Sequence, residues 1–385
     1  MKSYFNFLSY LLKVDKTILG FVYSALLLYT VILVLPIRFE ENDDVVMLLL
    51  ASGNYTGQFE SNLIFINPLY GKIVSFLYSI SSDIEWYTLL YVAFHWVSLS
   101  IIISKLLEMK VSKFVKITLI LFFSVIGMNF LMYLQFTTVS MFLCIAVFFM
   151  YPFNYSKKKI VIVSILLLAL ASLIRPEIVL LLTVSIFPFF LINSIRNRNY
   201  LDIAIAILFV FLPLISIQLR DKLLISEEWS KATTYNRLRA EVTDNINADY
   251  AYDNYNGVCS EADYNLLKNF FIAPEFFNSE KLEALRVKVQ QKESIFTKLM
   301  NIPFQLKNYL KEFLFFGLIL MILFFKNPSK KECLLLFLYG CFLLSLSAYL
   351  SLDGMLKNRV FIAFVLLYVL VISFSISSFQ SLHKF

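Results

Sequence analysis

Residues 17–44 read TILGFVYSALLLYTVILVLPIRFEENDD. The stretch 17–37 carries no charged residue and is long enough to cross the hydrocarbon core of a bilayer as an α-helix. It is too long for a signal-peptide core, so we expect an uncleaved first membrane span. Four carboxylates follow at once, in the run Arg38-Phe-Glu-Glu-Asn-Asp-Asp44. An apolar helix that ends in an acidic run predicts an integral membrane protein with polar groups at one membrane surface.

The composition of the whole chain favours the same fold class. Of the 385 residues, 59% are hydrophobic and 16% are charged, whereas a soluble domain has about 45–50% apolar and about 25% charged residues. A soluble fold has too small a core for so much apolar surface, so we expect lipid to cover most of it. The formal charge of +7 lies mostly in short loops, where it sets membrane topology and predicts no nucleic-acid partner.

Hydropathy predicts an all-α protein with about ten membrane-spanning helices. The predicted spans are Thr17–Ile37, Trp86–Ser104, Ile117–Tyr133, Phe136–Phe153, Ile160–Ile174, Ile178–Ile195, Leu201–Leu219, Tyr309–Phe325, Cys333–Leu352 and Val360–Ser377. We expect an N-terminal bundle over residues 1–219 with a first external loop at 38–85, an external cap over residues 220–308, and C-terminal spans over residues 309–385.

The apolar stretch Ile64–Ile80 decides the orientation of every later loop. If it does not span, the Lys-rich loops lie on the side of the termini, which is the positive-inside pattern with both termini cytoplasmic. The opposite short loops then carry few cations, namely Arg38, Lys72, Arg175, Lys357 and Arg359. We therefore expect Ile64–Ile80 to form a helix at the outer interface of the cytoplasmic (inner) membrane, where Pro68, Gly71 and Lys72 are tolerated.

The polar segment Arg220–Gln305 predicts a small helical cap outside the membrane. It contains two helical patterns, Glu261–Phe271 and Ser279–Lys298, and it is too rich in aromatic residues for a linker. Within it, Tyr235 and Arg237 belong to an aromatic and basic cluster. Aromatic rings stack on sugar faces and Arg pairs with phosphate, but the same residues also suit packing of the cap at the membrane surface.

The pair Asp43 and Asp44 is the first candidate for chemistry. A carboxylate at the outer surface, beside lipid head groups, can deprotonate an acceptor hydroxyl as a general base. The alternative is a solvated acidic loop, although acidic residues contribute little to topology. A pair of carboxylates can also bind a divalent cation, but the sequence shows no metal-binding motif and predicts no cofactor.

This layout resembles the GT-C membrane glycosyltransferases. The features that carry the resemblance are an acidic pair in the first external loop, a juxtamembrane helix after it, and a second one with Pro68 and Gly71. The resemblance implies an enzyme that takes a sugar from a polyprenyl-phosphate carrier, with an Asp of the first external loop as the catalytic base. That role falls on Asp43 or Asp44.

Two further outer loops carry cations that fit an anionic ligand. Arg175-Pro-Glu177 lies between the fifth and sixth predicted spans, where Arg175 is either a snorkelling anchor or a phosphate clamp. Lys357 and Arg359 lie between the last two spans, against the positive-inside bias. The resemblance favours phosphate binding at Arg175 and Arg359, because external basic residues bind the donor phosphate in GT-C enzymes.

Together with these residues, the resemblance implies a membrane glycosyltransferase that acts in envelope polysaccharide or glycolipid synthesis. Its expected partners are membrane lipid, a lipid-linked sugar donor, and a saccharide or lipid acceptor. The alternatives are a repeat-unit polymerase for O-antigen or capsule, and a transporter or flippase for a lipid-linked saccharide. His95, inside the second span, is either functional or a buried structural residue. Walker A, HExxH, GxSxG and Rossmann signatures are absent from the sequence, which disfavours the corresponding enzymes.

Overall fold

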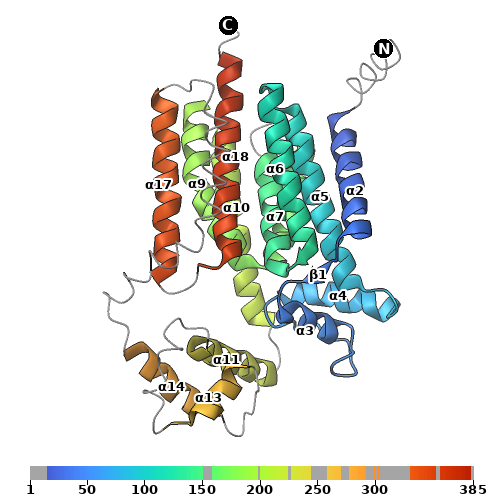
Figure 1. The fold of residues 1–385 in the computed structure, drawn as a ribbon, viewed down its shortest axis with the longest axis vertical. Coiled ribbons are helices and arrows are strands. Elements are labelled where there is room, and N and C mark those ends of the chain that lie inside the picture. The colour runs from blue at the N-terminus through green and yellow to red at the C-terminus, as the bar shows by residue number, and fades with distance from the viewer. Residues whose placement is uncertain are drawn as a thin grey trace. The chain divides into compact units, whose positions relative to one another are not determined.

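The computed structural model is almost entirely helical, as Figure 1 shows. It describes residues 15–150, 158–197, 200–223, 227–243, 258–269, 277–291, 299, 302, 330–352 and 356–382. In chain order the elements are α2 (Lys16–Val34), β1 (Arg38–Phe39), α3 (Asn42–Ala51), α4 (Pro68–Ile80), α5 (Trp86–Glu108), α6 (Lys113–Met132), β2 (Tyr133–Leu134), α7 (Phe136–Met150), α8 (Lys158–Ile174), α9 (Pro176–Asn197), α10 (Tyr200–Leu223), α11 (Glu227–Thr243), α13 (Glu261–Lys268), α14 (Ser279–Gln291), α17 (Lys330–Leu352) and α18 (Asn358–Leu382).

Seven helices of the described chain are long and apolar enough to cross a membrane. They are Lys16–Val34, Trp86–Glu108, Lys113–Met132, Pro176–Ile195, Tyr200–Lys222, Cys333–Leu352 and Asn358–Ile376. Each corresponds to a predicted span, so the prediction of a multi-pass, all-α membrane protein holds at this level. Two more predicted spans fall on α7 and α8, which have 15 and 17 described residues. The predicted span Tyr309–Phe325 lies outside the described residues, so the total of about ten stays a prediction.

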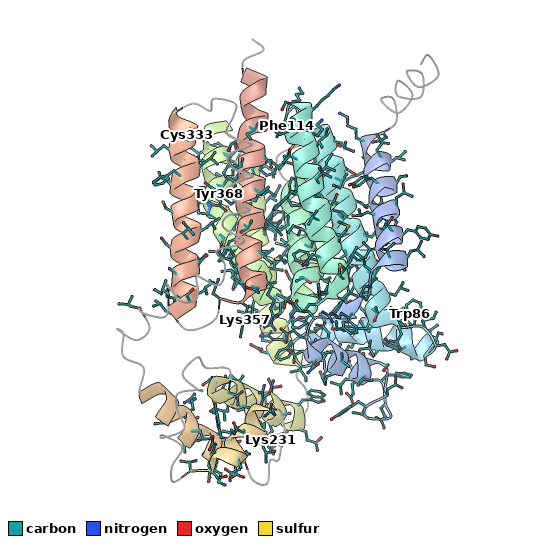
Figure 2. The ribbon with its side chains drawn as sticks, viewed as in Figure 1. Trp86, Phe114, Lys231, Cys333, Lys357 and Tyr368 are labelled. Carbon is teal, nitrogen blue, oxygen red and sulfur yellow. The ribbon has the colours of Figure 1, made fainter. Side chains whose placement is uncertain are left out.

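Helix α7 forms the centre of the bundle. All its residues, from Phe136 to Met150, are buried, and none of them is charged. A helix that is apolar on every side has to be covered by other helices or by lipid. Helices α5, α8 and α9 pack around α7. Trp86 is the first residue of α5, and Phe114 lies in the first turn of α6. Figure 2 shows these two residues at opposite ends of the bundle, so α5 and α6 run antiparallel.

Helices α2 and α5 approach each other closely through small residues. A Cβ atom added at Gly20 would lie 2.1 Å from the Ser104 hydroxyl oxygen. One turn further along, the Ser24 and Ser100 hydroxyls form a hydrogen bond. Small residues allow such close contact between membrane helices, and the hydrogen bond between hydroxyls stabilises it in an apolar medium.

Helix α4 is amphipathic and too short to span. Its 13 residues rise about 20 Å, whereas the hydrocarbon core is about 30 Å thick. The Asn67 side chain caps its first turn by accepting a hydrogen bond from the Leu69 N–H. One face is buried against the protein, with Tyr70, Val74 and Tyr78. The opposite face exposes large apolar side chains, namely Leu69, Ile73, Phe76 and Ile80.

The chain divides into two compact units. The first contains Met1–Leu223, Ile319–Tyr339 and Ala363–Phe385, and the second contains Leu224–Leu318 and Gly340–Ile362. In the first unit, Figure 1 shows α3 and α4 together at the end of the bundle where α5 begins.

The second unit has a core of its own between α11, α13 and α14. The buried residues of this core are Leu238, Val242, Tyr264, Leu267, Phe277, Leu282 and Leu285. Helix α13 starts with a capping box in which the side chains and backbone N–H groups of Ser260 and Asp263 bind each other. The cap of α14 is Asn278, whose side chain accepts from the Lys281 N–H. Helices are therefore present at both predicted places in this segment, and Asn278 caps the second.

Candidate functional site

A two-residue parallel strand pair holds the acidic run against the bundle. Strand β1 pairs with β2 in the register Arg38 to Tyr133 and Phe39 to Leu134. The Glu40 N–H extends the pair by donating to the Leu134 carbonyl oxygen at 3.0 Å. The Arg38 guanidinium lies 4.9 Å from the centre of the Tyr133 ring, within the range of a cation–π contact. The run is thereby fixed at the corner between α6 and α7.

The structure gives the two carboxylates of the acidic pair different environments. Both lie in the first turn of α3, where the helix dipole favours negative charge. The Asp44 side chain is fully buried, and its Oδ1 accepts hydrogen bonds from the Tyr87 hydroxyl at 2.9 Å and from the Phe136 N–H at 3.1 Å. Asp43 is only half-buried. Of the two, Asp43 is therefore better placed to meet a substrate, and Asp44 connects α3 to α5 and α7.

A hydrogen-bonded chain of tyrosines ends on the buried carboxylate, and a tyrosine of α4 binds the same segment of α5. The Tyr91 hydroxyl donates to the Tyr87 hydroxyl at 2.8 Å, and the Tyr87 hydroxyl donates to Asp44. From α4, the Tyr78 hydroxyl donates to Glu85 Oε2 and accepts from the Tyr87 N–H. Burial raises the pKa of Tyr78 to about 12, and it raises the pKa of Tyr70 still further above its usual range. Both phenols therefore stay protonated at physiological pH.

Arg175 lies at the corner between α8 and α9, next to two aromatic rings. Its guanidinium carbon is 5.2 Å from the centre of the Phe136 ring and 5.5 Å from that of Phe65. The planes of these two rings are nearly parallel, and the centres of the rings are 5.8 Å apart. The Arg175 side chain is 27% exposed, so it touches both the protein interior and the surface. Such a position is typical of an Arg that packs its apolar stem while its head reaches a ligand or a lipid head group.

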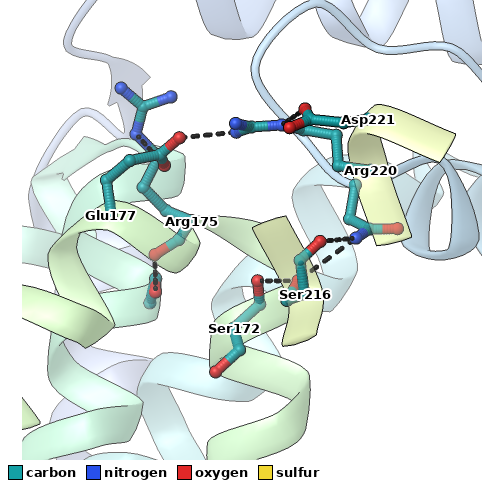
Figure 3. A network of polar contacts seen from close by, with 8 residues as sticks. Ser172, Arg175, Glu177, Ser216, Arg220 and Asp221 are labelled. Atoms are coloured by element: carbon teal, nitrogen blue, oxygen red, sulfur yellow. Dashed lines mark hydrogen bonds and ion pairs between the residues drawn. The ribbon is translucent and has the colours of Figure 1, made fainter. Parts of the chain in front are cut away.

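Glu177 links two arginines across the bundle. Its carboxylate pairs with Arg175 Nε at 3.4 Å and also with the Arg220 guanidinium, which in turn pairs with Asp221 at 3.6 Å. Figure 3 shows this chain of charges from the start of α9 to the end of α10. The predicted site residue Glu177 therefore neutralises its cationic neighbours. A neutralised network ties helices together, and it is weaker evidence for anion binding than a cluster of cations alone.

The first loop is anchored to the same corner of the bundle by Asn67. Its side-chain amide nitrogen donates to the Ser216 carbonyl oxygen at 2.8 Å, and the Ser216 hydroxyl donates to the Ser172 carbonyl oxygen (Figure 3). The Asn67 N–H donates to the Leu173 carbonyl oxygen. The loop is thus bound to the ends of α8 and α10, close in sequence to Arg175 and Arg220.

Phe136 brings the two predicted parts of the site together. Its backbone N–H binds Asp44 and its ring contacts Arg175. Asp44 of the acidic pair and Arg175, the predicted phosphate ligand, therefore contact the same residue, although they lie far apart in sequence. Sequence reasoning missed Phe136, Tyr87 and Arg220. The spacing of Tyr87, Tyr91 and His95, which places them on one face of a helix, was the available signal for the tyrosines.

The remaining predicted site residues belong to the second unit. Tyr235 is half-buried and packs against the core of that unit. Arg237 is exposed and lies 4.0 Å from Glu241. Lys357 is exposed just before α18, and its carbonyl oxygen accepts hydrogen bonds from the Val360 and Phe361 N–H groups. Arg359 is half-buried in the first turn of α18. The contacts described around Phe136 do not include these four residues.

Two buried polar side chains near the site lack hydrogen-bond partners within the described part of the chain. The His95 ring lies beside the rings of Phe130 and Phe142, at centroid distances of 6.1 and 5.8 Å, and neither of its nitrogens is bonded there. The side-chain amide of Gln135 is buried and also unbonded. Among the described residues, no three His, Cys, Asp or Glu side chains gather in a way that would hold a metal ion.

No family model, curated protein or solved structure matches the chain. The contacts above bring the buried carboxylate of Asp44 and the partly exposed Arg175 together around Phe136, and the half-buried Asp43 precedes Asp44 in the same helical turn.

Proposed function

We propose that the protein is a membrane glycosyltransferase that moves a sugar from a polyprenyl-phosphate carrier to an acceptor outside the cytoplasmic membrane. The observation that carries the proposal is the shared contact of Asp44 and Arg175 with Phe136. It puts the acidic pair and a cation at one corner of the bundle. A transfer of this kind needs a base for the acceptor and a cation for the departing phosphate.

Asp43 is the proposed catalytic base. It takes the proton of an acceptor hydroxyl while the hydroxyl oxygen forms a bond to the anomeric carbon of the sugar. The bond between that carbon and the phosphate oxygen breaks, and polyprenyl phosphate leaves with the electron pair. Asp43 is chosen over Asp44 because it is half-buried, whereas Asp44 is fully buried and bound by two donors.

Arg175 is the proposed phosphate ligand. Its guanidinium stabilises the negative charge that develops on the leaving phosphate, and Arg binds phosphate with two parallel hydrogen bonds. Glu177 and Arg220 hold its orientation through their ion pairs. Lys357 and Arg359 are proposed as further phosphate ligands, and Tyr235 and Arg237 as sugar ligands. These four assignments follow from the predicted outer position of their segments.

The proposal includes about ten spans, cytoplasmic termini and a site at the outer surface of the inner membrane.

The alternative functions differ in which residues they require. A repeat-unit polymerase uses external arginines without a carboxylate base, and a transporter of lipid-linked saccharide performs no transfer. A carboxylate variant that inserts normally and still loses activity therefore separates a transferase from both.

The test is complementation of a deletion strain, with surface glycans and lipid-linked precursors profiled by mass. The strain receives the wild type, Asp43→Asn, Asp44→Asn or Arg175→Ala, and membrane insertion is checked for each. Asp83→Asn is the matched control, because Asp83 is an exposed carboxylate of the same loop. We expect Asp43→Asn to lower glycan output by about 10²–10⁴-fold and to accumulate precursor, while Asp83→Asn keeps full output.

The other possible outcomes of this experiment reassign the base or the function. Full output from Asp43→Asn together with loss in Asp44→Asn would move the base to Asp44. Full output from both variants would refute the transferase assignment. In that case, loss of output in Arg175→Ala alone would favour the polymerase.

A further inference from the structure

The tyrosines of α5 form a directional hydrogen-bond chain that ends on Asp44. Tyr91 donates to Tyr87, and Tyr87 donates to the Oδ1 atom of Asp44. All three side chains are fully buried. A hydroxyl that accepts one hydrogen bond becomes a stronger donor, so each member of such a chain strengthens the next. The chain ends on an acceptor that cannot donate when ionised.

This chain fixes the start of α3 from the inside of the bundle. Asp44 lies in the first turn of α3 and is held by Tyr87 from α5 and by the Phe136 N–H from α7. Asp43 precedes it in the same turn. A hydrogen bond that locks Asp44 therefore also sets the direction in which the Asp43 side chain leaves the helix. The Phe39 and Tyr87 rings add an edge contact at 6.0 Å between the acidic run and α5.

We propose that Tyr87 and Tyr91 are positioning residues, which hold Asp44 and thereby orient Asp43 toward the acceptor. The catalytic half of this inference rests on the proposed function, whereas the positioning of α3 does not. Tyr87 acts directly on Asp44 and Tyr91 acts through Tyr87. Replacing Tyr87 must therefore have the larger effect.

The experiment compares Tyr87→Phe and Tyr91→Phe with Tyr23→Phe in the full-length protein in lipid nanodiscs. Tyr23 is the matched control, because its hydroxyl also forms a hydrogen bond within the bundle, to Ser124 at 2.9 Å, and this bond joins α2 to α6 and does not involve α3. The first readout is amide hydrogen exchange of α3 by mass spectrometry. We expect Tyr87→Phe to speed exchange in α3 by about tenfold, Tyr91→Phe to speed it less, and Tyr23→Phe to leave it unchanged.

The second readout is transfer kinetics, with the lipid-linked precursor purified from the deletion strain as donor. We expect Tyr87→Phe to lower kcat by about tenfold with the donor KM unchanged, since no donor contact is lost. The double variant Tyr87→Phe/Asp44→Asn must be no slower than Asp44→Asn alone, because Tyr87 acts only through that carboxylate. A role in general stability would give additive losses and no split between kcat and KM.

The two readouts separate this inference from the proposed function. Unchanged α3 exchange in Tyr87→Phe overturns the positioning role whatever the activity. Faster α3 exchange with unchanged kcat overturns the catalytic half. Full activity of Asp43→Asn refutes the proposed function instead, and the exchange measurement then decides the positioning of α3 by itself.

Discussion

At the position of Gly71, α4 passes so close to the preceding loop that a Cβ atom would lie 1.9 Å from the Ser61 carbonyl oxygen. A backbone oxygen cannot move aside as the end of a flexible side chain can. Any side chain at this position must therefore push α4 away from the loop that carries it. Since α4 also holds Tyr70 and Tyr78 in the interior, that displacement would reach the tyrosines around Asp44.

The first prediction concerns this contact. Gly71→Ala should lower the stability of the detergent-solubilised protein by about 1–3 kcal/mol, measured as a lower melting temperature. Gly57→Asn is the control. Gly57 has a positive φ of 77° with nothing within 4 Å of an added Cβ, and Asn tolerates that backbone conformation. Equal melting temperatures for Gly71→Ala and the wild type would contradict the close approach.

At the same scale, the sequence predicted which residues are chemically interesting but not how they differ. Asp43 and Asp44 are adjacent and identical in type, so no pattern separates them. Their difference comes from Tyr87 and Phe136, which lie 43 and 92 residues away from Asp44. Contacts over such distances follow from packing, which hydropathy does not encode. The same reason explains why the sequence, which places Arg220 at the start of the polar segment 220–305, did not reveal its ion pair with Glu177.

At the scale of elements, helix α4 presents an apolar face that the described protein does not cover. Ile73, Phe76 and Ile80 are 48%, 63% and 63% exposed, while Val74 on the opposite side is fully buried. A helix with one apolar face and insufficient length to span lies in the membrane interface. The exposed face should therefore contact the outer leaflet beside the acidic pair.

The second prediction places that face by spin labelling in nanodiscs. A nitroxide at Ile73→Cys or Phe76→Cys should relax faster with oxygen than with a water-soluble nickel chelate, because oxygen concentrates in the lipid. A nitroxide at Gln58→Cys, in the exposed turn after α3, should respond mainly to nickel. Nickel access at all three sites would show that α4 lies in water, and the interfacial assignment would fail.

Element types were predictable because length and polarity set them. An apolar run of sufficient length without charge forms a spanning helix, as at α2, α5 and α6. The short pair β1–β2 was not predictable, since two-residue strands leave no periodic pattern. Neither was the Asn278 cap of α14, because Ser279 beside it offers an equally good cap in sequence.

At the scale of the whole molecule, the outer position of the site depends on whether α4 crosses the membrane. Its length argues that it does not, and the distribution of Lys and Arg among the loops argues the same. If it did cross, the acidic pair and Arg175 would end on opposite sides, which their shared contact with Phe136 makes impossible.

The third prediction tests this topology with alkaline phosphatase fusions, which are active only outside the cytoplasm. Fusions after Gln58 and after Asp83 should both be active, and a fusion after Lys110 should be inactive. These positions lie before α4, between α4 and α5, and between α5 and α6. Activity after Gln58 and Lys110 but not after Asp83 would mean that α4 spans.

The contact between Asp44 and Phe136 also has a consequence for how the protein is made. The two residues are 92 positions apart, and a ribosome adding about 5–20 residues per second needs about 5–20 seconds to travel from one codon to the other. For part of that interval Asp44 has only Tyr87, which is 43 residues away, as a hydrogen-bond donor, and it still lacks the Phe136 N–H. The carboxylate enters the bundle only when the corner before α7 arrives, and Arg175 completes the site later still. A nascent chain that ends before that corner would lack the Phe136 N–H, one of the two donors that distinguish Asp44 from Asp43.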